Sequence, residues 1–190
     1  MKPSAAAVVG VVGVVALAAV LAACGGGNAR QAAPAAPTTG SAVIRPAPVP
    51  APVGKPLLTL TGAVTNRNDA SAVVFDQRTL NAMATGTTST YEPFDKTTMT
   101  FNGVPMADLL ARAGIAPGAT KVHLHALDDY EVDLRVADFA DRRVLLATKA
   151  DGAAIPIKKG GPIRLVFPAD SIVGKNRDLW IWSIDAMTVT

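Results

Sequence analysis

Short runs of alternating apolar and polar residues recur from residue 57 to the end of the chain. Alternation with a period of two is typical of half-buried strands, and a short continuous apolar run is typical of fully buried ones. These patterns predict extended structure at 57–64, 73–75, 98–101, 122–126, 130–134, 144–148, 163–167, 180–184 and 187–189. Residues 85–90 are polar and β-branched, and they predict a loop or a ragged strand.

Two short helices interrupt the predicted strands. Asp76 is a suitable N-cap ahead of Leu80 and Met83, which share one helical face. Pro105 opens a second helix and Gly114 closes it, the usual placement of these residues at helix ends. Between them, apolar residues recur at helical spacing at Met106, Leu109, Leu110 and Ala113. Many short strands, few helices and no regular βα alternation predict an α+β fold with a mixed or mostly antiparallel sheet.

The first 23 residues have the character of a signal peptide. One positive charge at Lys2 precedes a run of small and apolar residues at 5–23, and Cys24 follows as the sole cysteine. A charged start, an apolar stretch and small residues at the cleavage point are typical of secretory signals. The Leu-Ala-Ala-Cys run at 21–24 resembles a bacterial lipobox, which implies cleavage before Cys24 and lipidation of its sulfur. The alternative is a plain transmembrane anchor, which the length of the run permits but its Gly, Ala and Val content disfavours.

Residues 24–55 differ in composition from residues 56–190. Ala, Pro, Gly and Thr dominate the earlier stretch, and its six prolines cannot occupy helix interiors or central strands. The stretch predicts a lipidated, disordered tether, because it cannot bury enough apolar surface to offset the entropy of ordering it. Residues 56–190 then form one domain of ordinary size. We therefore expect an exported lipoprotein, anchored to a membrane and facing the periplasm or the cell exterior.

The net charge of the domain differs from that of the whole chain. The chain has 18 Lys and Arg against 15 Asp and Glu, but four of the basic residues precede residue 56. The domain is left with 14 basic residues against all 15 acids. A nearly neutral domain has no electrostatic support for binding nucleic acid, and we exclude that class.

Several segments carry a resemblance through their order and spacing. They are Leu-Thr-Leu-Thr-Gly at 58–62, Thr-Phe-Asn-Gly-Val-Pro at 100–105, Leu-Leu at 109–110, Asp-Asp-Tyr-Glu at 128–131, Leu-Leu-Ala at 145–147, Asp-Gly at 151–152, Gly-Gly-Pro-Ile-Arg-Leu-Val at 160–166 and Trp-Ile-Trp-Ser-Ile at 180–184. In this order the domain resembles the molybdopterin-binding domain of the sulfite oxidase superfamily. The resemblance implies a sulfite-oxidase-like α+β fold and a pocket for molybdopterin or a related pterin.

The sequence also departs from the catalytic members of that superfamily. Those members bind molybdenum through a cysteine thiolate before the Phe-x-Gly-Val segment, whereas residues 85–91 here contain no cysteine. An unactivated hydroxyl is not a soft thiolate ligand, so molybdenum itself is not expected. Lys159 stands where catalytic relatives tend to carry a histidine, Leu179 replaces a basic residue, and Arg164 remains. Small exported members without the cysteine resemble periplasmic pterin-binding proteins that report to membrane-bound signalling partners, such as diguanylate cyclases and phosphodiesterases.

The candidate pterin site combines one arginine, aromatic rings and hydroxyls. Its residues are Arg164, Trp180, Trp182, Ser89, Thr90, Tyr91 and Lys159. The planar guanidinium of Arg164 suits a pterin carbonyl and ring nitrogen, and the alternative is an arginine paired with an acid. Trp180 and Trp182 share one face of the predicted final strand, where a ring either stacks on the ligand or packs in the core. The Lys-Lys-Gly-Gly run at 158–161 is either an anion cradle or a solvated loop.

Two further groups have competing interpretations. His123 and His125 lie on the same side of a predicted strand and with Asp128 or Asp129 offer metal ligands. A solvent-facing polar stripe is the favoured interpretation, because no third ligand has a defined spacing. The Asp-Asp-Tyr run at 128–130 either turns a hairpin, which is favoured, or places a carboxylate against a pterin.

These observations lead to one leading hypothesis and two alternatives. The leading hypothesis is a non-catalytic, lipid-anchored binding protein that presents a pterin-like ligand to a membrane signalling partner. The first alternative is a periplasmic oxidoreductase that holds a molybdenum cofactor without the usual cysteine. The second is a structural lipoprotein whose pocket has decayed.

Overall fold

The computed structural model describes residues 46–190, so Cys24 and the predicted signal peptide lie outside the described residues. The α-helices are α1 (Gln77–Met83) and α2 (Met106–Ala113). The strands are β1 (Pro56–Gly62), β2 (Val73–Asp76), β3 (Gly86–Glu92), β4 (Thr97–Pro105), β5 (Lys121–Ala126), β6 (Glu131–Arg135), β7 (Leu145–Ala150), β8 (Ala153–Ala154), β9 (Arg164–Val166) and β10 (Ile184–Val189). Four short 3₁₀ turns occupy Val136–Phe139, Ile157–Lys159, Val173–Lys175 and Arg177–Leu179. None of the helices in 46–190 has the length and apolar character that crossing a membrane requires.

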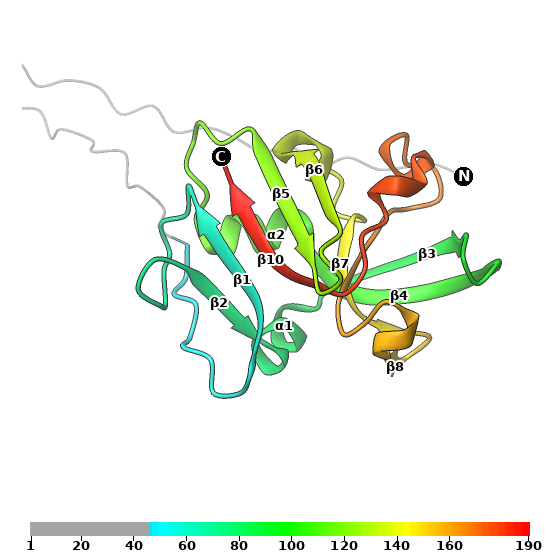
Figure 1. Cartoon of the computed structure of the whole chain (residues 1–190), viewed down its shortest axis with the longest axis horizontal. Helices are drawn as coiled ribbons and strands as arrows, with labels where there is room; N and C mark the ends of the chain where they lie inside the picture. Colours follow the sequence, from blue (N-terminus) through cyan, green and yellow to red (C-terminus); the bar gives the residue numbers. More distant parts are fainter. Residues whose placement is uncertain (1–45) are drawn as a thin grey trace, which may run out of the picture. The chain divides into compact units, whose positions relative to one another are not determined.

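The strands form two sheets, which Figure 1 shows side by side. The first has the order β2-β1-β10-β5-β6, and β1 and β10 run parallel while its other pairs are antiparallel. The second has the order β3-β4-β7-β8, with β9 also pairing to β7, and all its pairs are antiparallel. The predicted α+β class with mixed and antiparallel sheets is confirmed.

Both helices lie where local sequence signals predict them. The Asp76 side chain accepts a hydrogen bond from the Thr79 N–H at 2.8 Å and caps α1. Pro105 directly precedes α2, and Gly114 ends it in the left-handed conformation at φ 67°. This conformation strains any residue with a β-carbon, which explains the glycine.

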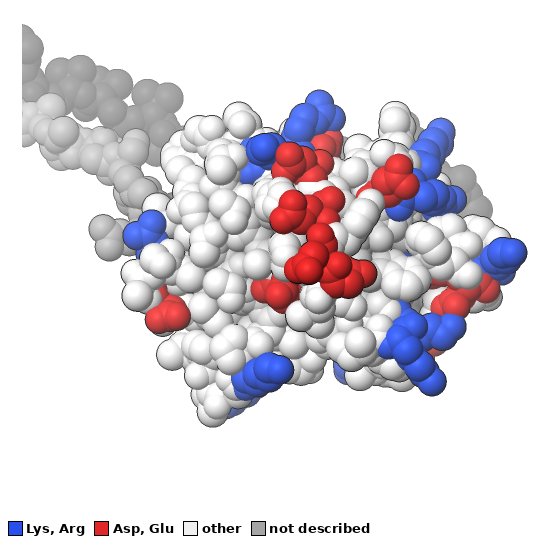
Figure 2. Space-filling model, in the orientation of Figure 1, with Lys and Arg blue, Asp and Glu red and all other residues white. Residues whose placement is uncertain are grey.

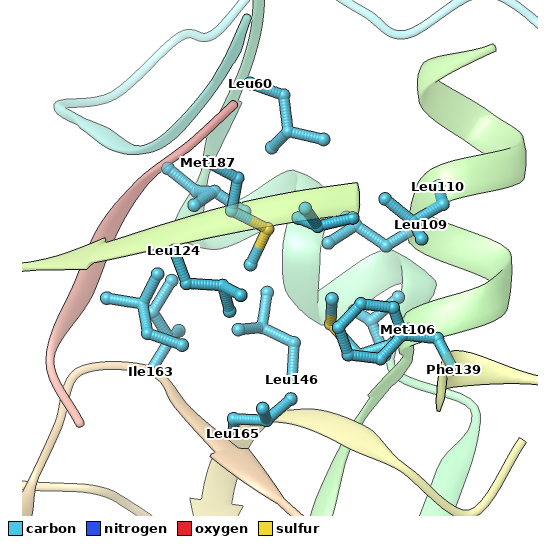
Figure 3. Packing of buried hydrophobic residues seen from close by; sticks show 14 of the residues in the cluster. Leu60, Met106, Leu109, Leu110, Leu124, Phe139, Leu146, Ile163, Leu165 and Met187 are labelled. Carbon is cyan, nitrogen blue, oxygen red and sulfur yellow. The ribbon is translucent and has the colours of Figure 1, made fainter. Parts of the chain in front are cut away.

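One hydrophobic core joins the two sheets through α2 (Figure 3). The first sheet contributes Leu124 and Met187, and the second contributes Leu146 and Leu165. The buried face of α2 consists of Met106, Leu109, Leu110 and Ala113, as the helical spacing predicts. Because β7 and β9 are part of this core, residues carried by β9 have a rigid support.

Two segments differ from the sequence-based prediction. Residues 86–92 form a regular strand rather than a loop or a ragged strand, because every residue from Gly86 to Glu92 pairs with β4. Conversely, the final strand begins at Ile184, and residues 180–183 are irregular. Their backbone instead bonds to the 160–165 segment, where the Ser183 N–H donates to the Gly160 carbonyl at 2.9 Å. Trp180 and Trp182 therefore do not share a strand face.

The domain also begins before residue 56. Val49 is buried in the core, although composition assigns it to the tether. Side chains of the domain bind the backbone of this segment: Asn66 donates to the Ala47 carbonyl, and Asn68 donates to the Pro50 carbonyl. The Asp76 carboxylate accepts from the Val53 and Gly54 N–H groups. We call residues 46–55 the strap, since side chains of the domain hold a segment that has no regular structure of its own.

Candidate functional site

A buried ion pair lies at the end of β3 and the start of β9. The Arg164 Nη2 donates to the Glu92 Oε1 at 2.9 Å, and both side chains are almost completely inaccessible to solvent. The second Glu92 oxygen accepts from the N–H groups of Phe94 and Asp95 in the turn after β3. Burial lowers the pKa of Arg164, while the hydrogen bond and charge of Glu92 oppose that change. Two charges removed from water require pairing with each other, so this pair is a specific feature of the fold.

Aromatic rings surround the Arg164 guanidinium. Its carbon lies 4.3 Å from the Trp182 ring centroid and 5.5 Å from that of Phe101. Phe94 contacts Trp182 edge-on, with ring centroids 4.8 Å apart. Rings at these distances stabilise the cation through their π-systems. The Arg164 side chain is thus fixed by one carboxylate and by the faces of its neighbours.

Two donors at this centre have no partner. The Arg164 Nε and the Trp182 Nε1 are buried and make no hydrogen bond within residues 46–190. Buried polar groups are bonded in the large majority of cases, and an unpaired donor beside a hollow is a candidate ligand contact. Both are N–H donors, so the complementary ligand atom is an acceptor such as a carbonyl oxygen or an unprotonated ring nitrogen.

A hollow of about 480 Å³ opens beside Arg164 between β4, β8 and the loop that precedes β9. Its apolar lining includes Met99, Phe101 and Ile155, and its polar lining includes Asp95, Lys159 and Arg164. This volume lies within the ~300–1,000 Å³ typical of small-molecule sites. Few polar groups on an apolar wall are also typical of such sites, where the polar groups fix the ligand's orientation.

The loop before β9 brings Lys159 to this hollow and packs against Trp182. Lys159 forms an ion pair with Asp95, so its charge is already compensated. Gly160 has φ 82°, and a β-carbon there would lie 2.6 Å from the Trp182 ring. The glycine is therefore required for Trp182 to lie against the loop. A β-carbon at Gly161 would lie still closer to the Ile155 carbonyl, so that position also has no room for a side chain.

A second, smaller hollow of about 180 Å³ has Trp182 in its wall. Its lining consists of Phe94, Asp128, Tyr130, Trp180 and Trp182. The Trp180 Nε1 donates to the Gly174 carbonyl at 2.8 Å, and its ring packs against Phe167 in the core. Trp180 is thus a structural residue with one edge at a hollow, whereas Trp182 is the indole that contacts Arg164.

The structure brings only part of the predicted site together. Arg164, Lys159 and Trp182 meet, but Ser89 and Tyr91 lie on the outer face of β3. Ser89 is exposed, bonds to the Thr100 hydroxyl and does not line the 480 Å³ hollow. Thr90 is buried and lines a different hollow of about 80 Å³, together with Tyr91 and Trp180.

Glu92 is the site residue that sequence reasoning missed. In β3 the inward positions are Thr88, Thr90 and Glu92, which alternate with exposed neighbours. A signal was present, since a glutamate two residues beyond Thr90 shares its face of an extended strand. The interpretation of 85–90 as a loop or a ragged strand concealed that relation.

The two histidines have carboxylate partners on the exposed face of the first sheet. The His123 Nδ1 lies 2.8 Å from Asp133, and the His125 Nδ1 lies 2.8 Å from Asp185. The hydrogen bond to Asp185 is the main cause that raises the pKa of His125. No group of three or more His, Cys, Asp or Glu within 46–190 is arranged to hold a metal ion. Asp129 has φ 64° in the β5–β6 turn, which confirms the predicted turn.

A family model described as the oxidoreductase molybdopterin binding domain matches residues 66–189. The chain belongs to this family. Among solved structures, this oxidoreductase molybdopterin-binding domain is similar to the sulfane dehydrogenase SoxCD from Paracoccus pantotrophus, with a TM-score of 0.54 and 22% identity. The match covers 70% of this chain and 37% of that chain, and it supports the sulfite-oxidase-like fold. No curated protein sequence matches the chain.

The residues of this family member fit the pterin of a molybdenum cofactor better than they fit its metal. Arg164 and Trp182 offer unpaired N–H groups that suit the acceptor atoms of a pterin. The sole cysteine of the chain is Cys24, so residues 46–190 contain no thiol that could ligate molybdenum. The Glu92 carboxylate is already held by Arg164 and two backbone N–H groups. The site therefore fits the pterin and does not offer the usual thiolate ligand of the metal.

Proposed function

We propose that the chain is a non-catalytic, lipid-anchored binding protein for a pterin-like ligand. The observation that carries the proposal is the Arg164 guanidinium, which has an unpaired Nε–H and lines a 480 Å³ hollow in a domain without a thiol. The planar guanidinium suits the carbonyl and ring nitrogen of a pterin edge, and Trp182, which also has an unpaired N–H, stacks on it. Arg164, Trp182 and Lys159 form the proposed site, and Glu92 positions the guanidinium.

The ligand that fits this site is flat, apolar on its faces and weakly charged. Both cations that line the hollow have carboxylate partners, Glu92 for Arg164 and Asp95 for Lys159. A strongly anionic ligand therefore finds no uncompensated positive charge. A pterin ring without a phosphate tail is the ligand class that this balance favours.

Titration of tryptophan fluorescence with reduced pterins tests the proposal. Saturable quenching is expected, because the Trp182 ring contacts Arg164. Trp182→Phe keeps a ring but removes the N–H and the fluorescent reporter, and we expect about tenfold weaker binding by calorimetric titration. Trp180→Phe is the matched control, since the Trp180 N–H is bonded to Gly174. Absence of quenching in a chain folded by circular dichroism contradicts the proposal.

Membrane attachment through Cys24 and presentation to a signalling partner complete the proposed function. The support for attachment is the lipobox-like Leu-Ala-Ala-Cys run at 21–24. Cys24→Ser is expected to abolish lipid modification, seen as loss of the acyl mass in mass spectrometry of the exported protein. Cross-linking in native membranes tests whether a signalling partner binds the chain. Recovery of the chain alone contradicts the proposed presentation to a partner.

The second candidate function is a molybdenum-dependent oxidoreductase, and family membership favours it. When bound, the cofactor would supply oxygen-atom or electron transfer at the metal, and Arg164 and Trp182 would hold its pterin. Metal analysis of protein exported by its native route discriminates the two candidates. One molybdenum per chain overturns the non-catalytic proposal, and pterin without metal supports it.

A further inference from the structure

The smaller hollow is lined almost entirely by aromatic side chains. The chain contains five Phe, two Tyr and two Trp, and four of these nine line a space of about 180 Å³. They are Phe94, Tyr130, Trp180 and Trp182, and the carboxylate of Asp128 completes the lining. We call this set the aromatic box. The proposed pterin site uses only its Trp182 wall.

Two of these rings are unusually accessible to solvent. Phe94 is 55% exposed and Tyr130 is 45% exposed, while the phenylalanines elsewhere in residues 46–190 are buried in the core. Hydrogen bonds hold the polar ends of two box residues: the Tyr130 hydroxyl donates to the Asp178 carbonyl, and the Trp180 N–H donates to that of Gly174. The box is therefore preorganised. Because the polar groups of Tyr130 and Trp180 are already bonded, their rings offer a ligand only π-surface and carbon atoms. Both exposed rings are therefore available to a ligand at this hollow.

Charges of both signs border the box: Arg164 and Arg177 contact its Trp182 and Trp180 rings from outside the lining, and the lining itself carries a carboxylate. Asp128 lines it, and Asp129 and Glu131 come next in the same β5–β6 hairpin. Figure 2 shows acidic side chains gathered in the middle of the displayed face, over β5 and β6. A negative surface beside a hollow raises the local concentration of cations and lowers that of anions.

The chemistry of the lining selects among cations. A metal ion needs several oxygen or nitrogen ligands, and a primary ammonium has three N–H groups to satisfy. The box offers one carboxylate. A quaternary ammonium has no N–H groups, sheds water readily and is stabilised by aromatic faces. The volume of 180 Å³ is below the ~300–1,000 Å³ of sites for larger ligands, which suits a head group.

We propose that the aromatic box of Phe94, Tyr130, Trp180 and Trp182, closed by Asp128, binds a quaternary ammonium group. The site is distinct from the pterin hollow: the two linings share no residue, and they adjoin where the Trp182 ring contacts Arg164. The ligand is a small molecule with a trimethylammonium head, and its remainder extends into solvent past the exposed Phe94 and Tyr130 rings.

Calorimetric titration of the mature chain with choline tests the proposal. The matched ligand is 3,3-dimethyl-1-butanol, which has the same shape with carbon in place of the charged nitrogen. Saturable binding of choline, about tenfold tighter than that of the neutral isostere, is expected from the cation–π contribution. Equal affinities, or no saturable binding of choline, would overturn the proposal.

Variants of exposed residues localise the site without disturbing the core. Phe94→Ala and Asp128→Asn are each expected to weaken choline binding several-fold, and circular dichroism verifies the fold. Tyr91→Ala is the control, since Tyr91 is a similarly exposed aromatic outside the box. Equal effects of Phe94→Ala and Tyr91→Ala contradict the assignment. Reduced pterin is expected to bind in the presence of saturating choline, and competition between them would contradict two separate sites.

Discussion

Removal of the Arg164 guanidinium is the sharpest test of how the site is held together. Arg164→Met keeps an apolar chain against Trp182 and Phe101 but leaves the Glu92 carboxylate buried without its cation. Breaking a buried pair in this way costs about 3–5 kcal/mol. Glu92 retains its hydrogen bonds from the Phe94 and Asp95 N–H groups, so we expect the lower end, about 3 kcal/mol.

Equilibrium unfolding in urea measures this effect. With a slope of roughly 1.5 kcal/mol per molar urea, a loss of about 3 kcal/mol lowers the unfolding midpoint by about 2 M. The double variant Arg164→Met/Glu92→Gln removes both charges and keeps a carbonyl oxygen for the Phe94 and Asp95 N–H groups. It is expected to recover at least half of the loss, because no buried charge remains. A single variant within about 1 kcal/mol of the wild type, or a double variant no more stable than the single one, would refute this reasoning.

Three further predictions concern the loop, the strap and the histidines. Gly160→Ala places a β-carbon against the Trp182 ring at a φ of 82°, and we expect a loss of about 1–3 kcal/mol and altered tryptophan fluorescence. The hydrogen bonds that Asp76 accepts from α1 and the strap lower the pKa of its carboxyl group. The stability that Asp76 contributes is present above its unfolded-state pKa of about 3.9 and is lost as the pH falls below that value. Thermal unfolding between pH 6 and pH 2 should therefore show a shallower decline in Asp76→Asn, and identical slopes would contradict the assignment. Asp185→Asn removes the hydrogen bond that is the main cause of the raised pKa of His125. An NMR titration should show the pKa of His125 fall toward its ordinary value. An unchanged titration midpoint would be evidence against the His125–Asp185 pair.

The sequence predicts best what neighbouring residues determine. Helix α2 is the clearest example, since Pro105, the apolar spacing and Gly114 each act within the helix or at its ends. The orientation of β3 could not be obtained in this way. Its residues are polar or small on both faces, so alternation alone does not show that Thr88 lies inside and Ser89 outside. Pairing with β4, a tertiary interaction, makes that choice.

Distant contacts also explain the remaining errors. The composition of residues 46–55 is that of a tether, but Asn66, Asn68 and Asp76 satisfy its backbone polar groups from the domain. Likewise, aromatic periodicity suggested that Trp180 and Trp182 lie on one strand face. The 160–165 segment instead takes the backbone hydrogen bonds of residues 181–184, and the two indoles acquire different environments.

The Glu92 carboxylate connects the Arg164 side chain to the backbone of the turn after β3. One of its oxygens contacts Arg164, and the other accepts from the Phe94 and Asp95 amides. A displacement of the Arg164 guanidinium therefore affects, through the Glu92 side chain, two backbone amides in the turn between β3 and β4. Amide hydrogen exchange at these two positions will track occupancy of the site without a chemical label, because protection there depends on the carboxylate staying in place.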